Sequence, residues 1–319
     1  MKHILAADIG GTNSRFAHFT SDSNGKLSLV NTIWFQTGEV TSFEELISGL
    51  NKKSFSILPD QADVTVIAIA GPVERGVYSA PPFISWDVDV SNAKTDYGFN
   101  TCLLINDFVA QAYSCKSPVG NEAESILSGH IVNDAAVAVI GAGTALGKAV
   151  LMPDGKGGYI AVPSEGGHAS FPFSSEGEFQ YHKFLLRQIN QKYITANFVV
   201  SGRGLSYLHH FLSGRDLKPE EVAAELSIDS ETLIWASRFY GRVCRNYALE
   251  TLALGGVYIA GGVAAKIPQL LKHGAFEAEF RSSSTMSDIL GNIPVFLITN
   301  EESGLWGAAF LGLQILNKT

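Results

Sequence analysis

The feature that most constrains the fold is a strand–glycine turn–strand pattern that occurs twice, at residues 3–20 and 135–152. In the first copy, the apolar run HILAADI leads into the turn GGTN, and the alternating run SRFAHFT follows. In the second copy, the turn GAGTALG separates two apolar runs. Glycine-rich turns between such runs are typical of paired strands. The recurrence predicts two related α/β domains with a cleft between them.

The rest of the chain alternates between the two kinds of periodicity. Residues 64–72 form a continuous β-branched run, which predicts a central strand, and residues 231–253 repeat their apolar positions at helical spacing. Further strands are expected at 27–35, 102–106, 157–167, 257–262 and 293–299, and further helices at 41–53, from 107, at 176–191, 203–212 and 304–316. We expect a smaller domain of residues 1–109 joined by the C-terminal helix 300–319, and a larger domain of residues 110–299.

Composition excludes several classes of protein. With 46% hydrophobic and 17% charged residues, the 319-residue chain can bury large cores and is not disordered. A net charge of −8 without any basic run argues against binding nucleic acid. No apolar stretch is long enough for a membrane span, and the N-terminus lacks a signal peptide. Three cysteines without CxxC spacing suit a reducing, cytoplasmic location, in which they are small buried side chains.

The first glycine turn carries a candidate phosphate site. Gly10 and Gly11 permit a close backbone approach to a ligand, and successive N–H groups of such a turn form an anion-binding nest. Thr12 and Asn13 add side-chain donors, and Asp8 at the strand end would face the ligand or a cation. A plain hairpin turn explains the glycines equally well, so this motif alone leaves both interpretations open.

Two later glycine turns extend this pattern. Gly141, Gly143 and Thr144 lie in the turn of the second copy, where its recurrence favours a phosphate site over a bulged hairpin. Gly261 and Gly262 follow a buried strand and precede a helix, which could accommodate a base or ribose. A tight strand-to-helix turn is the common alternative for the second pair.

Polar residues in two apolar neighbourhoods are candidates for substrate contacts. Asn106 and Asp107 end a buried strand where a helix begins, and either could simply cap that helix. Glu165 and His168 flank a double glycine, and a carboxylate beside an imidazole suits a polyhydroxylated substrate. One His and one Glu are too few for a zinc site.

In this order, the segments DIGGTNSR, AIAGPV, INDF, GAGTALG, EGGH, VVSGRGL and GGVYIAGG resemble the bacterial glucokinase family. These proteins are group A hexokinases of the actin-like ATPase superfamily. The resemblance covers nearly the whole chain, from Asp8 to the closing helix. It implies a two-domain actin-like ATPase (ribonuclease H-like) fold with an interdomain cleft.

The resemblance also implies an activity, the ATP-dependent phosphorylation of the 6-hydroxyl of glucose. The DIGGT and GAGT turns would hold phosphates, GGVYIAGG would border the adenosine, and Asp8 would reach Mg²⁺ through water. Asp107 matches the general base, and Asn106, Glu165 and His168 match sugar ligands. The chain departs from the family at two sugar-binding positions. A usual Glu is replaced by Asn197, a ligand that remains able to hydrogen-bond, and Phe83 stands where an Asn aligns.

Two other functions remain open at this stage. The chain could phosphorylate another hexose or an amino sugar, since a lost hydrogen bond to one hydroxyl changes discrimination strongly. It could also be a non-catalytic sugar-binding regulator. Against a regulator, Asp107 is retained and no helix-turn-helix precedes the first strand. The expected partners are a hexose and ATP, with no nucleic acid or membrane, and the sequence leaves a homodimer open.

Overall fold

The structure is a computed structural model that describes residues 1–318. The chain folds into two compact units. Among the described residues, the first unit contains 1–122, 155–161 and 300–318, and the second contains 123–154 and 162–299. Residues 110–122 and 155–161 therefore belong with the N-terminal unit, whereas the predicted division assigned them to the larger domain. The predicted division and the observed units both place the C-terminal segment with the N-terminal unit.

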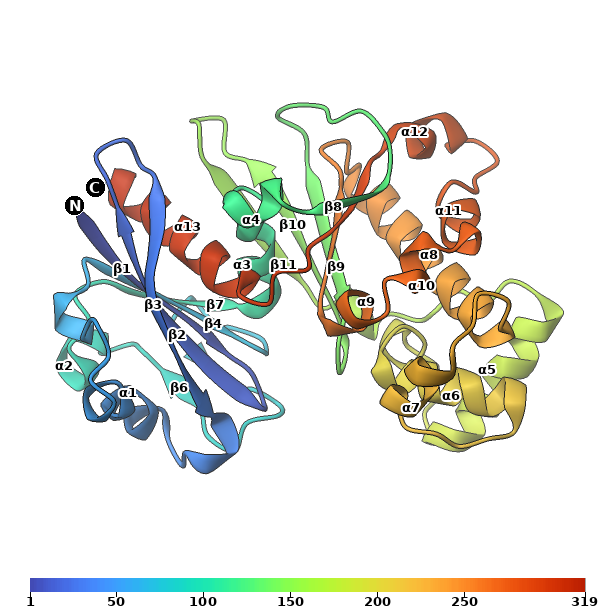
Figure 1. Cartoon of the computed structure of the whole chain (residues 1–319), viewed down its shortest axis with the longest axis horizontal. Helices are drawn as coiled ribbons and strands as arrows, with labels where there is room; N and C mark the ends of the chain where they lie inside the picture. The colour runs from blue at the N-terminus through green and yellow to red at the C-terminus, as the bar shows by residue number, and fades with distance from the viewer. Residues whose placement is uncertain (319) are drawn as a thin grey trace. The chain divides into compact units, whose positions relative to one another are not determined.

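The first unit is built on a five-stranded sheet with the order β3-β2-β1-β4-β7 (Figure 1). Strands β1, β2 and β3 are antiparallel neighbours, as the sequence predicted, whereas β1, β4 and β7 run parallel. The strands span β1 Lys2–Ile9, β2 Asn13–Ser21, β3 Leu27–Gln36, β4 Val64–Ile69 and β7 Cys102–Asn106. A small hairpin of β5 (Tyr78–Ser79) and β6 (Val88–Asp89) lies outside this sheet.

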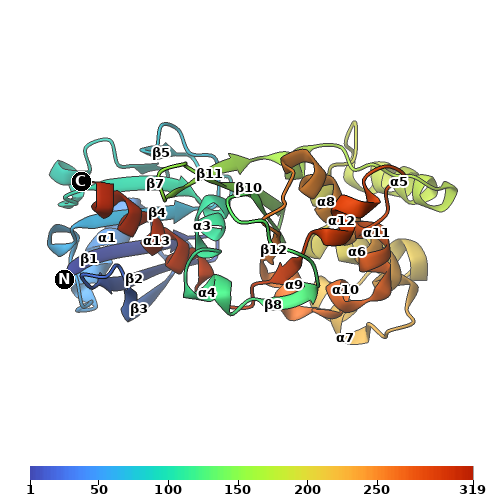
Figure 2. The same ribbon diagram turned by 90° about the horizontal axis from the view of Figure 1, so that it is seen from above.

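Helices cover both faces of this sheet (Figure 2). One face packs against α1, where Leu5 and Ala7 of β1 join Phe43 and Leu46 of the helix in one buried cluster. Because side chains alternate across a strand, Ala6 and Asp8 of β1 face the other side. The helices of this unit are α1 Phe43–Lys52, α2 Ala93–Tyr97, α3 Asp107–Ser114, α4 Pro118–Asn121 and α13 Ser303–Lys318.

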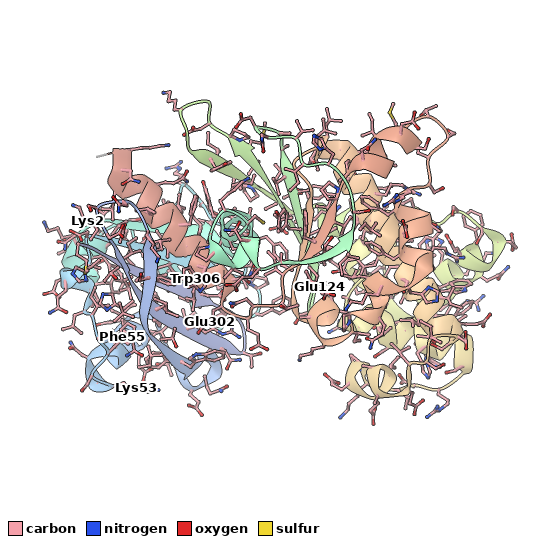
Figure 3. All side chains as sticks on the ribbon, turned by 45° about the horizontal axis from the view of Figure 1, so that its top comes forward. Lys2, Lys53, Phe55, Glu124, Glu302 and Trp306 are labelled. Carbon is pink, nitrogen blue, oxygen red and sulfur yellow. The ribbon has the colours of Figure 1, made fainter. Side chains whose placement is uncertain are left out.

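Helix α13 lies on the other face and approaches its neighbours closely at glycines. A Cβ on Gly312 would lie 2.9 Å from Ile4 of β1, and one on Gly307 would collide with the carbonyl oxygen of Ala110 in α3. Trp306 points from α13 toward the sheet (Figure 3) and packs edge-on against Phe19 with ring centroids 4.9 Å apart. These contacts make the last helix an integral part of the first unit.

The second unit repeats the strand arrangement of the first. Its six-stranded sheet has the order β11-β10-β9-β12-β13-β8, in which β9 and β10 are antiparallel while β9, β12 and β13 are parallel. The strands span β8 Glu124–Leu127, β9 Val137–Ala142, β10 Leu146–Pro153, β11 Tyr159–Ser164, β12 Val257–Ala260 and β13 Val295–Leu297. The division between the units falls within β11, after Ala161. With β8 as the additional edge, this order confirms the predicted duplication.

A large helical layer completes the second unit, and its main cluster of buried side chains joins β9, β12 and β13 to α8. The helices are α5 Glu176–Ile189, α6 Gly202–Ser213, α7 Pro219–Glu225, α8 Glu231–Thr251, α9 Gly262–Lys266, α10 Gln269–Lys272, α11 Gly274–Phe280 and α12 Ser287–Asn292. None of the helices among the described residues is both long enough and apolar enough to span a membrane.

A buried ion cluster ties α5, α8 and α11 together. The guanidinium of Arg242 donates to both carboxylate oxygens of Glu178, at 2.6 and 3.0 Å, and to Glu279 at 2.8 Å. It also donates to the carbonyl oxygen of Pro172 at 2.9 Å. Arg238 adds a second cation 3.1 Å from Glu178. Because the two central side chains are almost fully buried, the cluster depends on complete mutual pairing.

Candidate functional site

In the first unit, two candidate carboxylates lie at the same edge of the sheet. Asp8 pairs in register with Ala68 of β4, and Ala68 pairs with Ile105 of β7. Asn106 and Asp107 follow directly at the end of β7. Strands in a sheet are about 4.8 Å apart, so the backbones of Asp8 and Ile105 are separated by roughly 10 Å, and Asp107 lies two residues beyond Ile105. Ligands of open α/β sheets bind at this carboxyl edge of the parallel strands.

Asn106 and Asp107 both contribute to the start of α3. Asn106 is the N-cap, and its side-chain oxygen accepts from the N–H of Phe108 at 2.9 Å, while its amide donates to the carbonyl oxygen of Gly71 at 3.0 Å. One Asp107 oxygen accepts from the same N–H at 3.0 Å. The helix therefore already has its cap in Asn106, and capping alone does not account for Asp107. The first helical turn also favours the ionised form of its carboxylate.

Asp8 carries a half-buried carboxylate with few protein contacts. Burial raises its pKa, and the positive charge of Arg15 offsets only part of that shift. Within residues 1–318, no group donates a hydrogen bond to this carboxylate, and Arg15 instead donates to the carbonyl oxygen of Glu301 and stacks over Trp34 at 4.0 Å. A desolvated carboxylate without a donor is suited to a cation.

The predicted phosphate turn of the first unit closes on itself through its backbone. The N–H of Gly10 donates to the carbonyl oxygen of Asn13 at 2.9 Å, while Gly11 and Thr12 are exposed at the tip. A Cβ on Gly11 would lie 3.0 Å from Cβ of Phe83, so the segment that contains Phe83 lies directly beside this turn. The Phe83 side chain is 63% exposed.

In the second unit, the corresponding turn lines a pocket of about 420 Å³. Gly143 and Thr144 lie on one side of the pocket, and Gly262 at the start of α9 also lines it. The remaining wall comes from α6, α7 and α9 and includes Gly202, Arg203, Leu205, Pro219, Glu220, Ala223, Val263, Lys266 and Ile267. An apolar lining with a few polar and charged groups, at this volume, is typical of a small-molecule site.

Hydrogen bonds and close approaches hold the turns of this pocket together. The N–H of Gly202 donates to the carbonyl oxygen of Gly143 at 3.0 Å, which joins the first turn of α6 to the glycine turn. Gly261 has a φ of +96°, and a Cβ there would lie 2.8 Å from the carbonyl oxygen of Ala142. Glycine is therefore required at this position. Gly141 lies within β9, where it pairs with Gly147, and not in the turn itself.

The structure gathers the three predicted sugar ligands of the second unit. Glu165 and His168 are exposed, with 3.8 Å between the carboxylate and the imidazole. Between them, Gly167 is buried so closely against the Leu146 carbonyl oxygen and the Asn197 side chain that a Cβ would collide with both. The Asn197 side-chain oxygen accepts from the N–H of Leu146 at 2.8 Å. Its amide nitrogen is thus the end that could contact a ligand.

Several residues at these sites were not identified from the sequence. Arg203, Glu220 and Lys266 line the pocket from three helices, and each resembles an ordinary charged residue of a helix surface. The segment VVSGRGL did give a usable signal for one of them. Its Ser201 caps α6 by accepting from the N–H of Gly204 at 3.1 Å, which places Arg203 in the first helical turn.

Comparison with solved structures gives the class of protein. A glucokinase from an Antarctic psychrotroph superposes with a TM-score of 0.83 and 27% identity, covering 98% of both chains. A Streptomyces griseus ROK family glucokinase, solved with glucose and AMPPNP, has a TM-score of 0.64 and 16% identity over 97% of this chain and 98% of that one. The chain has the two-unit fold of the actin-like ATPase sugar kinases.

Sequence comparison narrows this class to one family. The profile described as Glucokinase matches residues 5–315. Glucokinases of Nostoc punctiforme and Erwinia tasmaniensis are 31% and 32% identical to this chain; the alignments cover 99% and 96% of the chain and 100% and 96% of the two relatives. The chain belongs to the glucokinase family, and the predicted resemblance is confirmed.

Proposed function

We propose that this chain transfers the γ-phosphoryl group of ATP to the 6-hydroxyl of glucose, with Asp107 as the general base. The observation that carries the assignment of Asp107 is its position at the carboxyl edge of the first sheet, the edge at which Asp8 also lies near the end of β1. Kinases of this kind need a base for the hydroxyl and a carboxylate for the cation of the nucleotide. The edge supplies both.

The pocket of the second unit is proposed to bind the nucleoside part of ATP. Apolar side chains of Leu205, Val263 and Ile267 suit the faces of a base, and the cations of Arg203 and Lys266 suit phosphate oxygens. Helix α6 begins at this pocket with its N-terminus, which favours an anion. The roles that the sequence predicted for the two glycine turns are retained as proposals: phosphate binding for Gly143 and Thr144, and contact with the base or ribose for Gly261 and Gly262. Phosphate binding is also still proposed for Gly141, which leaves β9 without a side chain at that position.

The residues present fit the Mg²⁺ that such a transfer requires. Mg²⁺ prefers oxygen ligands and keeps several waters, and one or two carboxylates are enough to hold it beside the phosphates. Asp8 offers a carboxylate that no described residue occupies with a hydrogen bond. The cation would neutralise charge on the β- and γ-phosphates when bound, and the backbone N–H groups of Gly11 and Thr12, at the exposed tip of the turn, would hold phosphate oxygens.

The reaction follows from these positions. Asp107 takes the proton of the 6-hydroxyl as that oxygen bonds to the γ-phosphorus, and the bond from phosphorus to the β–γ bridging oxygen breaks to release ADP. The N-terminus of α3 provides partial positive charge beside the Asp107 carboxylate. Asn106, Glu165, His168 and Asn197 are proposed to hold the other hydroxyls, with Asn106 fixed by its bond to Gly71.

The test is Asp107→Asn, which keeps the size of the side chain but removes the base. The value of kcat for glucose should fall by at least about 10²-fold, while glucose binding measured by calorimetry changes little. The matched control is Asp96→Asn, the same change in the first turn of α2 at an exposed position of the same unit. It should retain wild-type turnover.

The assay should follow ADP release with glucose, mannose, fructose and glucosamine. Turnover that is highest with glucose supports the proposal. Turnover with another hexose and none with glucose would replace glucose as the substrate while leaving the transfer chemistry in place. An Asp107→Asn enzyme that keeps its activity would remove Asp107 from the mechanism.

A further inference from the structure

We infer that Gln111 is the positioning residue for Asp8, and that its amide N–H hydrogen-bonds to the Asp8 carboxylate when the cation is bound. This inference rests on the proposed function of Asp8. Gln111 lies one helical turn after Asp107 on α3, so both residues lie on the same side of that helix. Neither its sequence context nor the resemblance assigns it a role.

The first turn of α13 shows how close the two side chains are. A Cβ built on Gly304 would lie 3.0 Å from Oδ2 of Asp8 and 3.5 Å from Nε2 of Gln111. A donor nitrogen and an acceptor oxygen thus converge on the space that Gly304 leaves open. A side chain larger than hydrogen at Gly304 would separate them.

Neither polar group is satisfied elsewhere. Among residues 1–318, no donor serves the Asp8 carboxylate, and Arg15 is engaged by Glu301 and Trp34. The Gln111 amide nitrogen has no acceptor in the same part of the chain. Carboxylates that hold metal ions are themselves commonly fixed by a hydrogen bond, and Gln111 is the amide placed to supply it.

The other end of the same amide gives an independent observation. Within the described residues, Oε1 of Gln111 is shielded from solvent and accepts no hydrogen bond. An unsatisfied buried acceptor lowers stability, so an apolar side chain of equal length would suit the fold better. A residue that costs stability and contacts the site is best explained by a role in that site.

The test is Gln111→Met, which keeps the length of the side chain and removes both polar ends. The affinity for Mn²⁺ in the presence of ADP, measured by electron paramagnetic resonance, should fall by about 10- to 100-fold. The melting temperature should stay the same or rise, because the unsatisfied oxygen is gone. The control is Gln180→Met on α5, where the amide donates to Glu176 at 2.7 Å on the surface. It should leave Mn²⁺ affinity unchanged.

A second variant separates the two ends of the amide. Gln111→Glu keeps an acceptor but lacks the N–H, so it should also weaken Mn²⁺ binding. If either Gln111 variant keeps the wild-type affinity for Mn²⁺ while Asp8→Asn binds Mn²⁺ weakly, the role of Gln111 is overturned and the proposed function is left intact. If the wild-type protein with ADP bound no Mn²⁺, or Asp8→Asn bound it normally, the proposed cation site and this inference would both be refuted.

Discussion

Replacing Arg242 with Met should reveal how strongly the second unit depends on its buried ion cluster. Arg242 contacts both oxygens of Glu178, and the two side chains are 4% and 1% exposed. The substitution removes the bonds of 2.6 and 3.0 Å to Glu178 and the bond of 2.8 Å to Glu279. It leaves the Glu178 carboxylate buried without its main partner.

The size of the effect follows from this burial. Removing one partner of a buried ion pair costs about 3–5 kcal/mol, because the remaining charge is uncompensated. Arg238 at 3.1 Å and the Ser174 N–H at 2.7 Å still contact Glu178, so we expect the lower end, about 3 kcal/mol. For a unit of this size, 1 kcal/mol shifts the melting temperature by about 2–4 °C, which predicts a decrease of roughly 6–12 °C.

The pH dependence should change in the same variant. Burial alone would raise the pKa of Glu178, but its hydrogen bonds from Arg242 and Ser174 and the charges of Arg242 and Arg238 outweigh burial and lower it. A lowered folded-state pKa stabilises the protein above the unfolded pKa of about 4.3, and this stability is lost as the pH falls through the folded value. Without Arg242, burial dominates and the folded-state pKa of Glu178 rises, so protonation of Glu178 favours the folded variant. The loss of stability relative to wild type should therefore be largest at neutral pH and become smaller as the pH falls toward the unfolded pKa of about 4.3.

The surface of the same unit offers a matched control. Arg215 and Glu225 form a bidentate pair of similar geometry, at 2.6 and 2.9 Å, but their side chains are 56% and 44% exposed. Scanning calorimetry should therefore show only a small change for Arg215→Met, since exposed pairs contribute little. Equal shifts in the two variants, or a decrease below about 2 °C for Arg242→Met, would contradict the reasoning from burial.

Two further predictions concern the loop beside the sugar ligands and the cysteines. In Gly167→Ala, the methyl group would collide with the Leu146 carbonyl oxygen and Asn197, so Glu165 and His168 must move. A displacement of about 1 Å should lower kcat/KM for glucose by on the order of 10²-fold, while calorimetry should show unchanged binding of an ATP analogue. Burial raises the pKa of the cysteine thiols, to about 12 for Cys102 and Cys115, and also raises that of Cys244. Thiol reagents at pH 8 should therefore react slowly with the folded protein, whereas after denaturation they should react readily with all three thiols. A fast reaction of the folded protein would contradict the burial of these thiols.

Much of the fold was predictable because it is encoded by local patterns. The two glycine turns and the β-branched run at 64–69 follow directly from strand periodicity and turn chemistry, and the duplicated strand order confirms them. Short elements were not predicted. The hairpin β5–β6 and the helices α10 to α12 contain two to seven residues each, too few for a periodic pattern to stand out.

The candidate site was predictable where a residue type is unusual for its surroundings. Asp107 and Glu165 stand beside apolar runs or glycines, so their carboxylates attract attention in the sequence. Lys266 and Gln111 do not, because a Lys or Gln on a helix is ordinary. Their significance depends on which other elements pack against that helix, and such long-range contacts leave no local trace. Asn197 is an intermediate case, because its alignment suggested a sugar ligand while its bond to Leu146 was unforeseen.

The position of α13 has a consequence for the synthesis of this protein. Strands β1 and β4 present Ile4 and Val64 to a helix that lies at the other end of the described chain. During translation, the strands of the first unit emerge long before the helix that covers this face. The apolar surface of these strands stays uncovered while the whole second unit is synthesised, so the second unit can finish folding first. During this interval the nascent chain is most able to bind chaperones or to aggregate. The length of the interval is set by the number of residues between these strands and α13.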